Sequence, residues 1–157
     1  MIPEAKRYVV CKGSGTSSVS QINAFDEALV DAGVGDLNLI KVSSVLPPDI
    51  VETREIPKGI GTFHPCVIAR AEGFKTGLKA GLCYGFREDG SGGYVVEHAV
   101  TTDDITADEF NEVLHQRLMS IGELRGVKLV DVKSEISERS IKDEVYGCAV
   151  VVLVYLP

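Results

Sequence analysis

The sequence predicts an α+β layered sandwich and not a doubly wound parallel sheet. Two segments have helical hydrophobic periodicity, and about seven have the β-branched, aromatic and small residues of strands. These strands come in groups along the chain and do not alternate strictly with the helices. The chain has 157 residues and is 45% hydrophobic, which is enough for one buried core. We therefore expect residues 1–157 to form a single domain.

The first helix is expected between a short strand and a pair of glycines. Residues 7–11 predict the strand, and residues 13–16 predict a tight turn before Ser17-Ser18, which suit the start of a helix. Asp26 lies about 100° around the helix from the apolar Phe25, so it flanks the buried face. That face is formed by apolar residues at spacings of three and four, up to a stop at Gly33 and Gly35: Val19, Ile22, Ala24, Phe25, Ala28, Leu29 and Ala32.

The middle of the chain predicts four strands. Residues 37–46 are mostly apolar and predict one strand, which Pro47-Pro48 must end because proline cannot donate a ladder hydrogen bond. A loop is expected across residues 52–59. Three further strands, rich in Val, Ile, Tyr and small residues, are predicted at residues 66–71, 81–87 and 93–99.

The second helix is predicted to begin at a capping box. Thr106 and Glu109 have the spacing in which each side chain bonds the other residue's backbone N–H, and Gly122 or Gly126 is expected to end the helix. Its apolar side is formed by Phe110, Val113, Leu114, Leu118 and Ile121. Residues 127–136 alternate like a strand, and residues 145–156 are almost wholly apolar, so the last strand should be central.

The charge of the chain limits its partners. Sixteen basic and 23 acidic residues give a net charge of −7, which disfavours nucleic acid and anionic membranes and is compatible with a cationic small ligand. Met1 to Arg7 lack the apolar stretch of a signal peptide, and no run approaches the roughly 18 apolar residues of a membrane helix. We expect a cytoplasmic protein with no membrane partner.

The cysteines and histidines do not predict a metal site. Four cysteines are widely spaced without a CxxC motif, each in or beside an apolar run, so we expect them to be small core residues: Cys11, Cys66, Cys83 and Cys148. His64, His98 and His115 are scattered and have no carboxylate companion at metal-ligand spacing.

The most informative motif is Ser43-Ser44, which follows Lys41-Val42 and precedes Val45-Leu46-Pro47-Pro48. Two hydroxyls within an apolar run can be interpreted as a self-cleavage site, in which the Ser44 hydroxyl attacks the Ser43 carbonyl to give an ester. Elimination and hydrolysis would then leave a pyruvoyl group at residue 44. Ser-Ser alone is a common dipeptide, so the motif needs support from the rest of the chain.

That support comes from four blocks in a fixed order. They are Gly13-Ser14-Gly15-Thr16-Ser17, Phe25-Asp26-Glu27-Ala28-Leu29, Asn38 with the Ser43-Ser44 segment, and Glu97 within Tyr94-Val95-Val96-Glu97-His98-Ala99. In this order and spacing the chain resembles the pyruvoyl-dependent arginine decarboxylase family. The resemblance implies a four-layer αββα protomer cut into residues 1–43 and 44–157, assembled as a trimer. It also implies a covalent pyruvoyl group derived from Ser44 and decarboxylation of L-arginine to agmatine.

The same resemblance implies roles for individual residues. Asn38 matches the donor that stabilises the oxyanion formed at Ser43, and Glu97 matches the general acid that returns a proton to the substrate Cα. Asp26 matches the carboxylate that binds the guanidinium, while Ser44 and Val45 contact the substrate. Glu97 and His98 should point to opposite faces of their strand, so His98 is assigned a structural role.

Plain alternatives exist for each residue and for the function. Asn38 could end the loop after Asp36, Glu97 could face solvent, and Asp26 could be one of several acids on a helix surface. The alternative functions are an unprocessed trimeric structural protein, a module that binds a cationic metabolite, or a decarboxylase of another basic amino acid.

Overall fold

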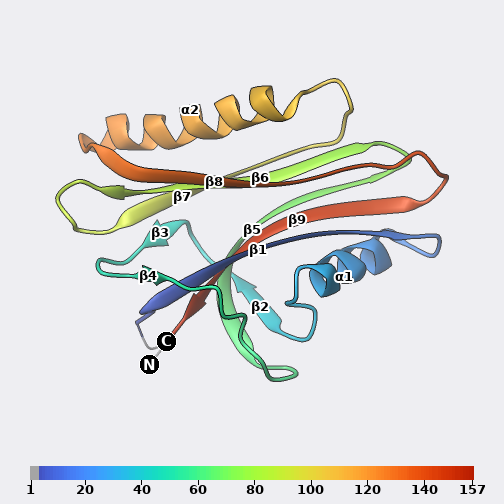
Figure 1. Cartoon of the computed structure of the whole chain (residues 1–157), viewed down its shortest axis with the longest axis horizontal. Coiled ribbons are helices and arrows are strands. Elements are labelled where there is room, and N and C mark those ends of the chain that lie inside the picture. The colour runs from blue at the N-terminus through green and yellow to red at the C-terminus, as the bar shows by residue number, and fades with distance from the viewer. Residues whose placement is uncertain (1–3) are drawn as a thin grey trace.

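The computed structural model describes residues 4–157, in which the chain forms two helices and nine strands (Figure 1). Residues 1–3 lie outside the described residues, so the expected domain and the N-terminal segment are described from residue 4 onward. The mixed α+β class predicted from the sequence is confirmed. In chain order the elements are β1 (Arg7–Ser17), α1 (Gln21–Asp31), β2 (Asn38–Lys41), β3 (Val45–Leu46), β4 (Val51–Glu52), β5 (Phe63–Phe74), β6 (Gly77–Arg87), β7 (Gly93–Val100), α2 (Ala107–Arg125), β8 (Leu129–Ser140) and β9 (Tyr146–Leu156).

The strands form two sheets. A five-stranded sheet has the order β2-β5-β9-β1-β4, and a four-stranded sheet has the order β3-β7-β6-β8. The central strand β9 runs antiparallel to both neighbours, with Val152 opposite Ile68 of β5 and opposite Cys11 of β1. The prediction that the last strand is central is therefore confirmed.

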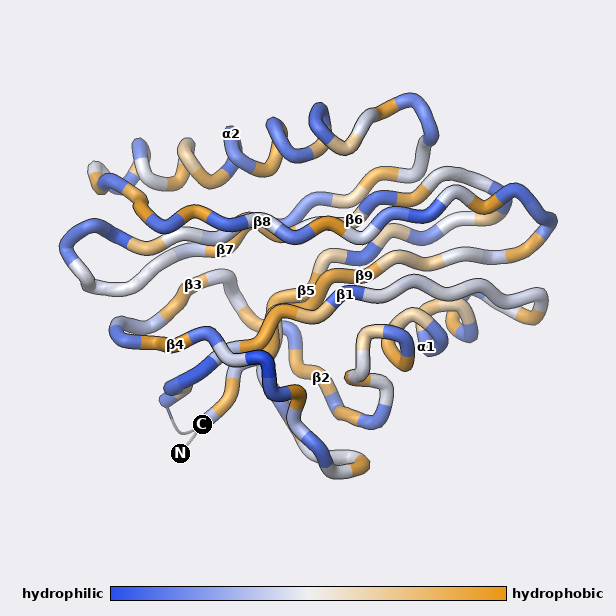
Figure 2. The backbone as a smooth tube through the Cα atoms, in the orientation of Figure 1, coloured by the Kyte–Doolittle hydropathy of each residue, from blue (hydrophilic) through white to orange (hydrophobic). Residues whose placement is uncertain are grey.

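Alternation along the strands separates three apolar clusters. Val151 and Leu153 of β9 point into the space between the sheets, where they meet Leu82 of β6, while Val150 and Val152 point to the other face. On that face α1 packs through Ala24, Ala28 and Ala32. On the outer face of the four-stranded sheet, α2 buries Phe110, Leu114 and Leu118. Figure 1 shows α1 and α2 at opposite sides of the two sheets, and Figure 2 shows hydrophobic residues concentrated along β9.

The start of the fold differs from the prediction. The expected turn at residues 13–16 is wrong, because β1 continues through them to Ser17. The two glycines instead allow α1 to lie directly on the strand: a Cβ at Gly13 would come within 2.4 Å of the Ala28 carbonyl oxygen, and one at Gly15 within 2.6 Å of the Ala28 nitrogen. The helix begins two to three residues later than expected, with Ser20 as its N-cap. Val19 and Ile22 are consequently exposed and do not belong to the buried face.

The single strand expected at residues 37–46 is also wrong. Residues 38–41 form β2, which pairs with β5 in the five-stranded sheet, and residues 45–46 form β3, which pairs with β7 in the other sheet. Val42, Ser43 and Ser44 carry the chain from one sheet to the other. Ile40, Val42 and Val45 are exposed, so the apolar run does not mark a buried strand.

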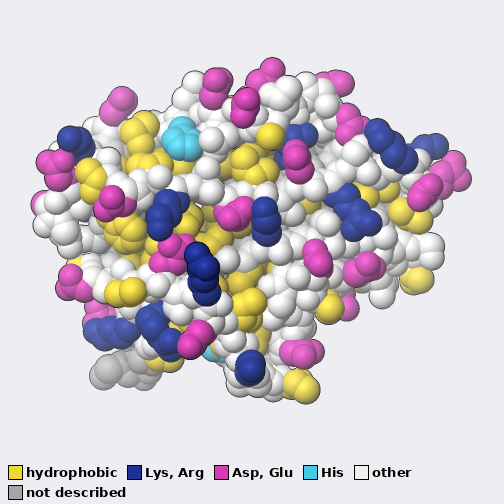
Figure 3. All heavy atoms as spheres, viewed as in Figure 1, with side chains coloured by type: hydrophobic (Ala, Val, Ile, Leu, Met, Phe, Trp, Pro, Cys, Tyr) yellow, Lys and Arg dark blue, Asp and Glu magenta, His cyan; other side chains and the backbone are white. Residues whose placement is uncertain are grey.

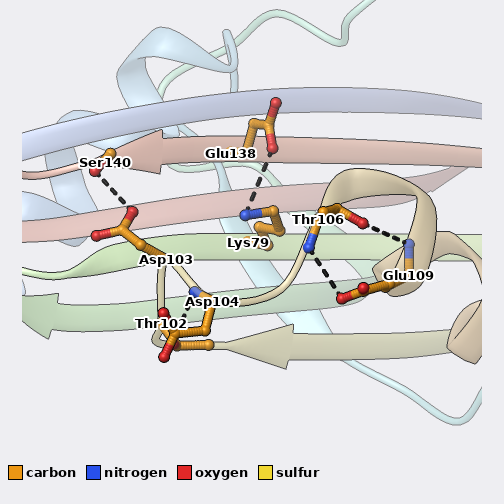
Figure 4. A network of polar contacts seen from close by, with 8 residues as sticks. All are labelled: Lys79, Thr102, Asp103, Asp104, Thr106, Glu109, Glu138 and Ser140. Atoms are coloured by element: carbon orange, nitrogen blue, oxygen red, sulfur yellow. Dashed lines mark hydrogen bonds and ion pairs between the residues drawn. The ribbon is translucent and has the colours of Figure 1, made fainter.

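The second helix begins and ends as predicted. Thr106 Oγ1 accepts a hydrogen bond from the Glu109 N–H at 3.1 Å, Glu109 Oε2 accepts one from the Thr106 N–H at 3.3 Å, and Gly126 has a φ of 65° at the C-cap. The segment before α2 is tied to β8, because Ser140 Oγ donates to Asp103 Oδ1 at 2.8 Å (Figure 4). These contacts fix the position of α2 over the four-stranded sheet.

All four cysteines are buried and free, as predicted, and burial raises the pKa of each thiol to about 11: Cys11, Cys66, Cys83 and Cys148. Across residues 4–157, no three His, Cys, Asp or Glu side chains are grouped so that they could bind a metal. In the same part of the chain, neither helix has the length and apolar character needed to span a membrane.

Candidate functional site

The Ser43–Ser44 peptide bond lies where the chain passes between the two sheets, and its flanks are fixed to both. The Val42 N–H donates to the Cys66 carbonyl of β5 at 2.9 Å, and the Val95 N–H of β7 donates to the Ser44 carbonyl at 3.0 Å. Ser43 is exposed and Ser44 is half-buried. The bond is therefore open to solvent while the backbone on each side is held.

Tyr155 supports the same segment from the core. Its hydroxyl donates to the Val45 carbonyl at 2.9 Å. Burial, with a smaller contribution from Cys66, raises the pKa of Tyr155 to about 12. The hydroxyl thus remains a neutral donor at ordinary pH, and Val45 is held directly after the bond of interest.

A pocket of about 770 Å³ opens beside this bond, between β7 and α2. Figure 3 shows one face of the molecule, on which acidic, basic and apolar side chains are interspersed. The pocket is lined by Ser43, Ser44, Val45, Tyr94, Val95, Val96, Glu97, Val113, Gln116, Arg117, Ser120, Ile121 and Arg125. The predicted residues Ser43, Ser44, Val45 and Glu97 therefore share one cavity.

Glu97 lines this pocket from β7. Its Oε1 is 3.3 Å from Lys41 Nζ of β2, while its Oε2 is buried and has no hydrogen-bond partner among residues 4–157. A buried carboxylate oxygen without a partner is unusual in folded proteins, and a catalytic role is one of its known explanations. The arrangement leaves one oxygen of Glu97 available to exchange a proton.

His98 faces away from Glu97, as predicted. Its ring stacks on Phe110 of α2, with centroids 4.8 Å apart. Burial lowers the pKa of His98, and the nearby positive charge of Arg117 lowers it further. Both effects favour the neutral ring, which is consistent with a packing role.

A second pocket, of about 780 Å³, meets the first at Glu97. It lies between α1, β2, β5 and β7, and its wall is mostly apolar with three basic side chains. The lining residues are Phe25, Leu29, Leu37, Leu39, Lys41, Cys66, Ile68, Ala69, Arg70, Glu97, His98, Ala99 and Arg117. Glu97 and Arg117 line both pockets, so they form the boundary between them.

Arg117 of α2 is fixed at this boundary. Its Nη1 donates to the backbone carbonyl of Glu97 at 2.8 Å. One guanidinium from α2 is thereby attached to β7 at the residue that carries the unpartnered carboxylate oxygen.

Two predicted site residues do not reach this place within one copy of the chain. Asn38 Nδ2 donates to the Gly61 carbonyl at 2.9 Å, and Asn38 lines neither pocket. Asp26 is exposed on α1 and lines neither pocket. Asn38 and Asp26 are therefore positioned away from Ser44 in the single chain.

Comparison with known proteins agrees with the resemblance. The sequence profile of the pyruvoyl-dependent arginine decarboxylase family matches residues 7–157. The chain is 34% identical over 152 residues to the pyruvoyl-dependent arginine decarboxylase of Methanopyrus kandleri, covering 96% of each chain. It is 33% identical over 156 residues to that of Thermococcus sibiricus, covering 97% of this chain and 96% of the other. The chain belongs to the pyruvoyl-dependent arginine decarboxylase family.

A solved structure also resembles this protein in fold. It is a pyruvoyl-dependent histidine decarboxylase at pH 8, with a TM-score of 0.52 and 17% sequence identity. The match covers 66% of this chain and 54% of the other, so this chain spans about half the length of that neighbour. At this identity the likeness is one of fold.

In this protein, the residues around position 44 fit a pyruvoyl group formed from Ser44. The Ser44 side chain lines a cavity, its carbonyl is held by the Val95 N–H, and the unpartnered oxygen of Glu97 lies at the same cavity. Because the group would be part of the chain, its position is set by these backbone contacts and needs no separate binding residues.

The sequence of this protein did not predict Lys41 or Arg117 as site residues. A signal existed for Lys41, which is a charged residue in an apolar run two positions before Ser43. Arg117 gave a weaker signal: it lies four residues after Val113, on the flank of the stripe formed by the buried residues of α2. Only the packing of α2 on β7 places it at the site.

Proposed function

We propose that this chain cuts itself between Ser43 and Ser44 and, with the pyruvoyl group formed at residue 44, decarboxylates L-arginine to agmatine and CO2. The observation that carries the proposal is the Ser43–Ser44 bond, held on both flanks and open to a cavity that contains Glu97. Family membership supports the arginine substrate. The products of the cut would be residues 1–43 and 44–157 of one domain. A cytoplasmic location stays a prediction from the sequence.

Self-cleavage follows from the chemistry of serine. The Ser44 hydroxyl attacks the Ser43 carbonyl, so the peptide C–N bond breaks as an ester C–O bond forms. Elimination then breaks the Cβ–O bond, which leaves that oxygen in the new carboxylate of Ser43 and a double bond in residue 44. Hydrolysis consumes one water and releases one ammonia, which leaves the ketone. Anchors at Val42, Ser44 and Val45 hold the reacting atoms together during these steps.

In decarboxylation, the pyruvoyl carbonyl supplies an acceptor for the electron pair left on the substrate Cα. Glu97 delivers the proton to that carbon through its unpartnered Oε2, while Lys41 holds Oε1 in place. A positioned general acid of this kind contributes about 10²- to 10⁴-fold to the rate. Val45, Val96 and Ile121 give the same cavity an apolar wall.

We also propose that each site is completed by a neighbouring copy, in a trimer of four-layer αββα protomers. Asn38 would donate to the oxyanion at Ser43 of the next copy, and Asp26 would accept two parallel hydrogen bonds from the substrate guanidinium there. Support comes from the position of both residues away from Ser44 of their own copy. Further support comes from Ile40, Val42 and Val45, which are 47%, 37% and 53% exposed on the edge that contains residue 44.

The activity is tested with carboxyl-labelled arginine. Purified wild-type protein is expected to release labelled CO2, and the Ser44→Ala variant, which cannot form the ketone, is expected to release none. Lysine and ornithine are assayed in parallel, and arginine should give the largest kcat/KM. Cut protein that carries the ketone and releases no CO2 from any of the three amino acids would contradict the proposal.

Sharing of the site between copies is tested by mixing variants. Asn38→Ala chains alone are expected to stay uncut, and Ser44→Ala chains cannot be cut. When the two are co-expressed, Asn38 of a Ser44→Ala chain can act on a neighbouring Asn38→Ala chain, so mass spectrometry should detect the cut form of the latter. If Asn38→Ala chains stay uncut in mixed oligomers, Asn38 does not act across the interface.

A further inference from the structure

The pocket beside Ser44 has an excess of positive charge in a chain whose net charge is −7. Its charged residues are Arg117, Arg125 and Glu97. The guanidinium of Arg125 lies over the Tyr94 ring, 4.4 Å from the centroid, three residues before Glu97 on β7. Arg117 uses one donor on the Glu97 carbonyl and, among residues 4–157, forms no ion pair. Most of its N–H donors are therefore free at the boundary of the two pockets.

We infer that Arg117 binds the α-carboxylate of the amino-acid substrate; this rests on the proposed decarboxylase function. The substrate amine must reach residue 44, and Glu97 must reach the substrate Cα. The carboxylate is bonded to that same Cα, so it must lie in the cavity that Ser44, Glu97 and Arg117 share. A planar guanidinium offers two parallel donors to such a carboxylate.

Lys41 is the other cation near Glu97, and it is less suited to this role. Its ammonium is 3.3 Å from Glu97 Oε1, and it lines the second pocket but not the one that contains Ser44. Arg117 is the cation that combines free donors, access to the pocket of Ser44 and a direct hydrogen bond to the backbone of Glu97.

The inference gives Arg117 opposite effects on substrate and product. Arginine carries the carboxylate that Arg117 attracts, whereas agmatine has lost it and has a more positive net charge. Arg117 should therefore strengthen substrate binding and weaken product binding. Because the carboxylate charge departs as CO2 forms, the attraction belongs to the ground state. Removing Arg117 should raise KM without lowering kcat.

The test compares processed wild-type protein with Arg117→Gln, and with Arg139→Gln as a control that removes the same charge from β8. Intact mass first confirms that all three chains are cut. The KM for arginine is then measured, together with the inhibition constants of agmatine and of argininamide, which has no carboxylate. We expect Arg117→Gln to raise KM about 10- to 100-fold, as for loss of a charged hydrogen-bonded pair, with kcat unchanged or higher. In Arg117→Gln, the inhibition constant of agmatine should fall and that of argininamide should not rise. Arg139→Gln should change none of these values.

A structural role for Arg117 predicts a different pattern. If Arg117→Gln weakens arginine, agmatine and argininamide together, or leaves KM unchanged, the inference is wrong. If Arg117→Gln is not cut, Arg117→Lys replaces it, since a lysine keeps the charge without the planar pair of donors. Arg117→Lys should then raise the KM for arginine and leave the inhibition constant of argininamide unchanged.

Binding measured without turnover separates this inference from the proposed function. Calorimetry compares the uncut Ser44→Ala variant with the double variant that also carries Arg117→Gln. The added Arg117→Gln substitution should weaken the binding of arginine and leave the binding of agmatine unweakened. Failure of wild-type protein to release CO2 would remove the proposed function. Normal CO2 release with equal losses of arginine and agmatine binding would remove only the role of Arg117.

Discussion

Glu97 is held by contacts from two elements distant in sequence. Lys41 of β2 approaches its side chain at 3.3 Å, and Arg117 of α2 binds its backbone carbonyl at 2.8 Å. The second carboxylate oxygen is left buried and without a partner among the described residues. At the scale of single residues, the site is thus a carboxylate with one oxygen held and one available.

Replacing Glu97 with glutamine tests its role as the general acid. The variant keeps the size of the side chain and loses the transferable proton, so kcat should fall about 10²- to 10⁴-fold while the chain is still cut. Steady-state kinetics and intact mass give the two readings. Glu138→Gln removes an exposed carboxylate of β8 that pairs with Lys79 of β6; it is the control and should retain kcat. A kcat for Glu97→Gln close to that of wild type would exclude the role.

His98 makes stability depend on pH. Its pKa lies below the usual 6.5 because of burial and then Arg117, so the unfolded chain binds a proton that the folded chain resists. The free energy of unfolding should fall as pH decreases through the window just below 6.5. Urea unfolding across this window should show a smaller dependence in His98→Gln than in wild type.

The effect of the Arg117 charge can be measured through the pKa of His98. In Arg117→Gln, the NMR titration of His98 should move to higher pKa, because one of the two causes of the lowering is removed. An unchanged titration would place the guanidinium away from this strand.

At the scale of elements, the contact between β1 and α1 depends on the two glycines of the strand. Gly13→Val would place a side chain against the Ala28 carbonyl and the Ala32 nitrogen, both of which are backbone atoms that cannot move aside. We expect a loss of about 2 to 3 kcal/mol in the free energy of unfolding. The measurement is urea unfolding at fixed protein concentration. Lys12→Val adds the same side chain at the neighbouring, exposed position and should cost much less.

Tyr155 links the core to the segment that is cut. Tyr155→Phe removes the donor to the Val45 carbonyl, so the backbone after Ser44 becomes less fixed. Loss of one hydrogen bond of about 1 kcal/mol should slow self-cleavage roughly fivefold. The cut is followed over time in chains made by cell-free synthesis. Tyr146→Phe, at a ring that packs edge-on against Phe74, is the control and should cleave at the wild-type rate.

Elements with local signals were predicted well. The capping box of α2 and the apolar run of β9 are properties of neighbouring residues, and both were found as expected. The role of Gly13 and Gly15 could not be predicted, because their close contact with α1 exists only after the helix packs on β1. The break between β2 and β3 was missed for a different reason: the exposed Ile40, Val42 and Val45 gave residues 37–46 the composition of one strand.

At the scale of the whole molecule, the predicted site is only partly assembled by one chain. Sequence order indicated Ser43, Ser44, Val45 and Glu97, and these residues line one pocket. Lys41 and Arg117 were missed because their role depends on how β2 and α2 pack around β7. Asn38 and Asp26 lie elsewhere on the protomer, and we expect a neighbouring copy to bring them to Ser44.

The central claim is that this chain makes its own pyruvoyl group, and the most direct measurement is the intact mass of the purified, denatured protein. We predict two chains, residues 1–43 and 44–157, with the second lighter by one ammonia than the same chain beginning with serine. A single uncut chain of 157 residues would contradict the claim. Two chains without the loss of ammonia would show that the bond is cut and that the group is not made.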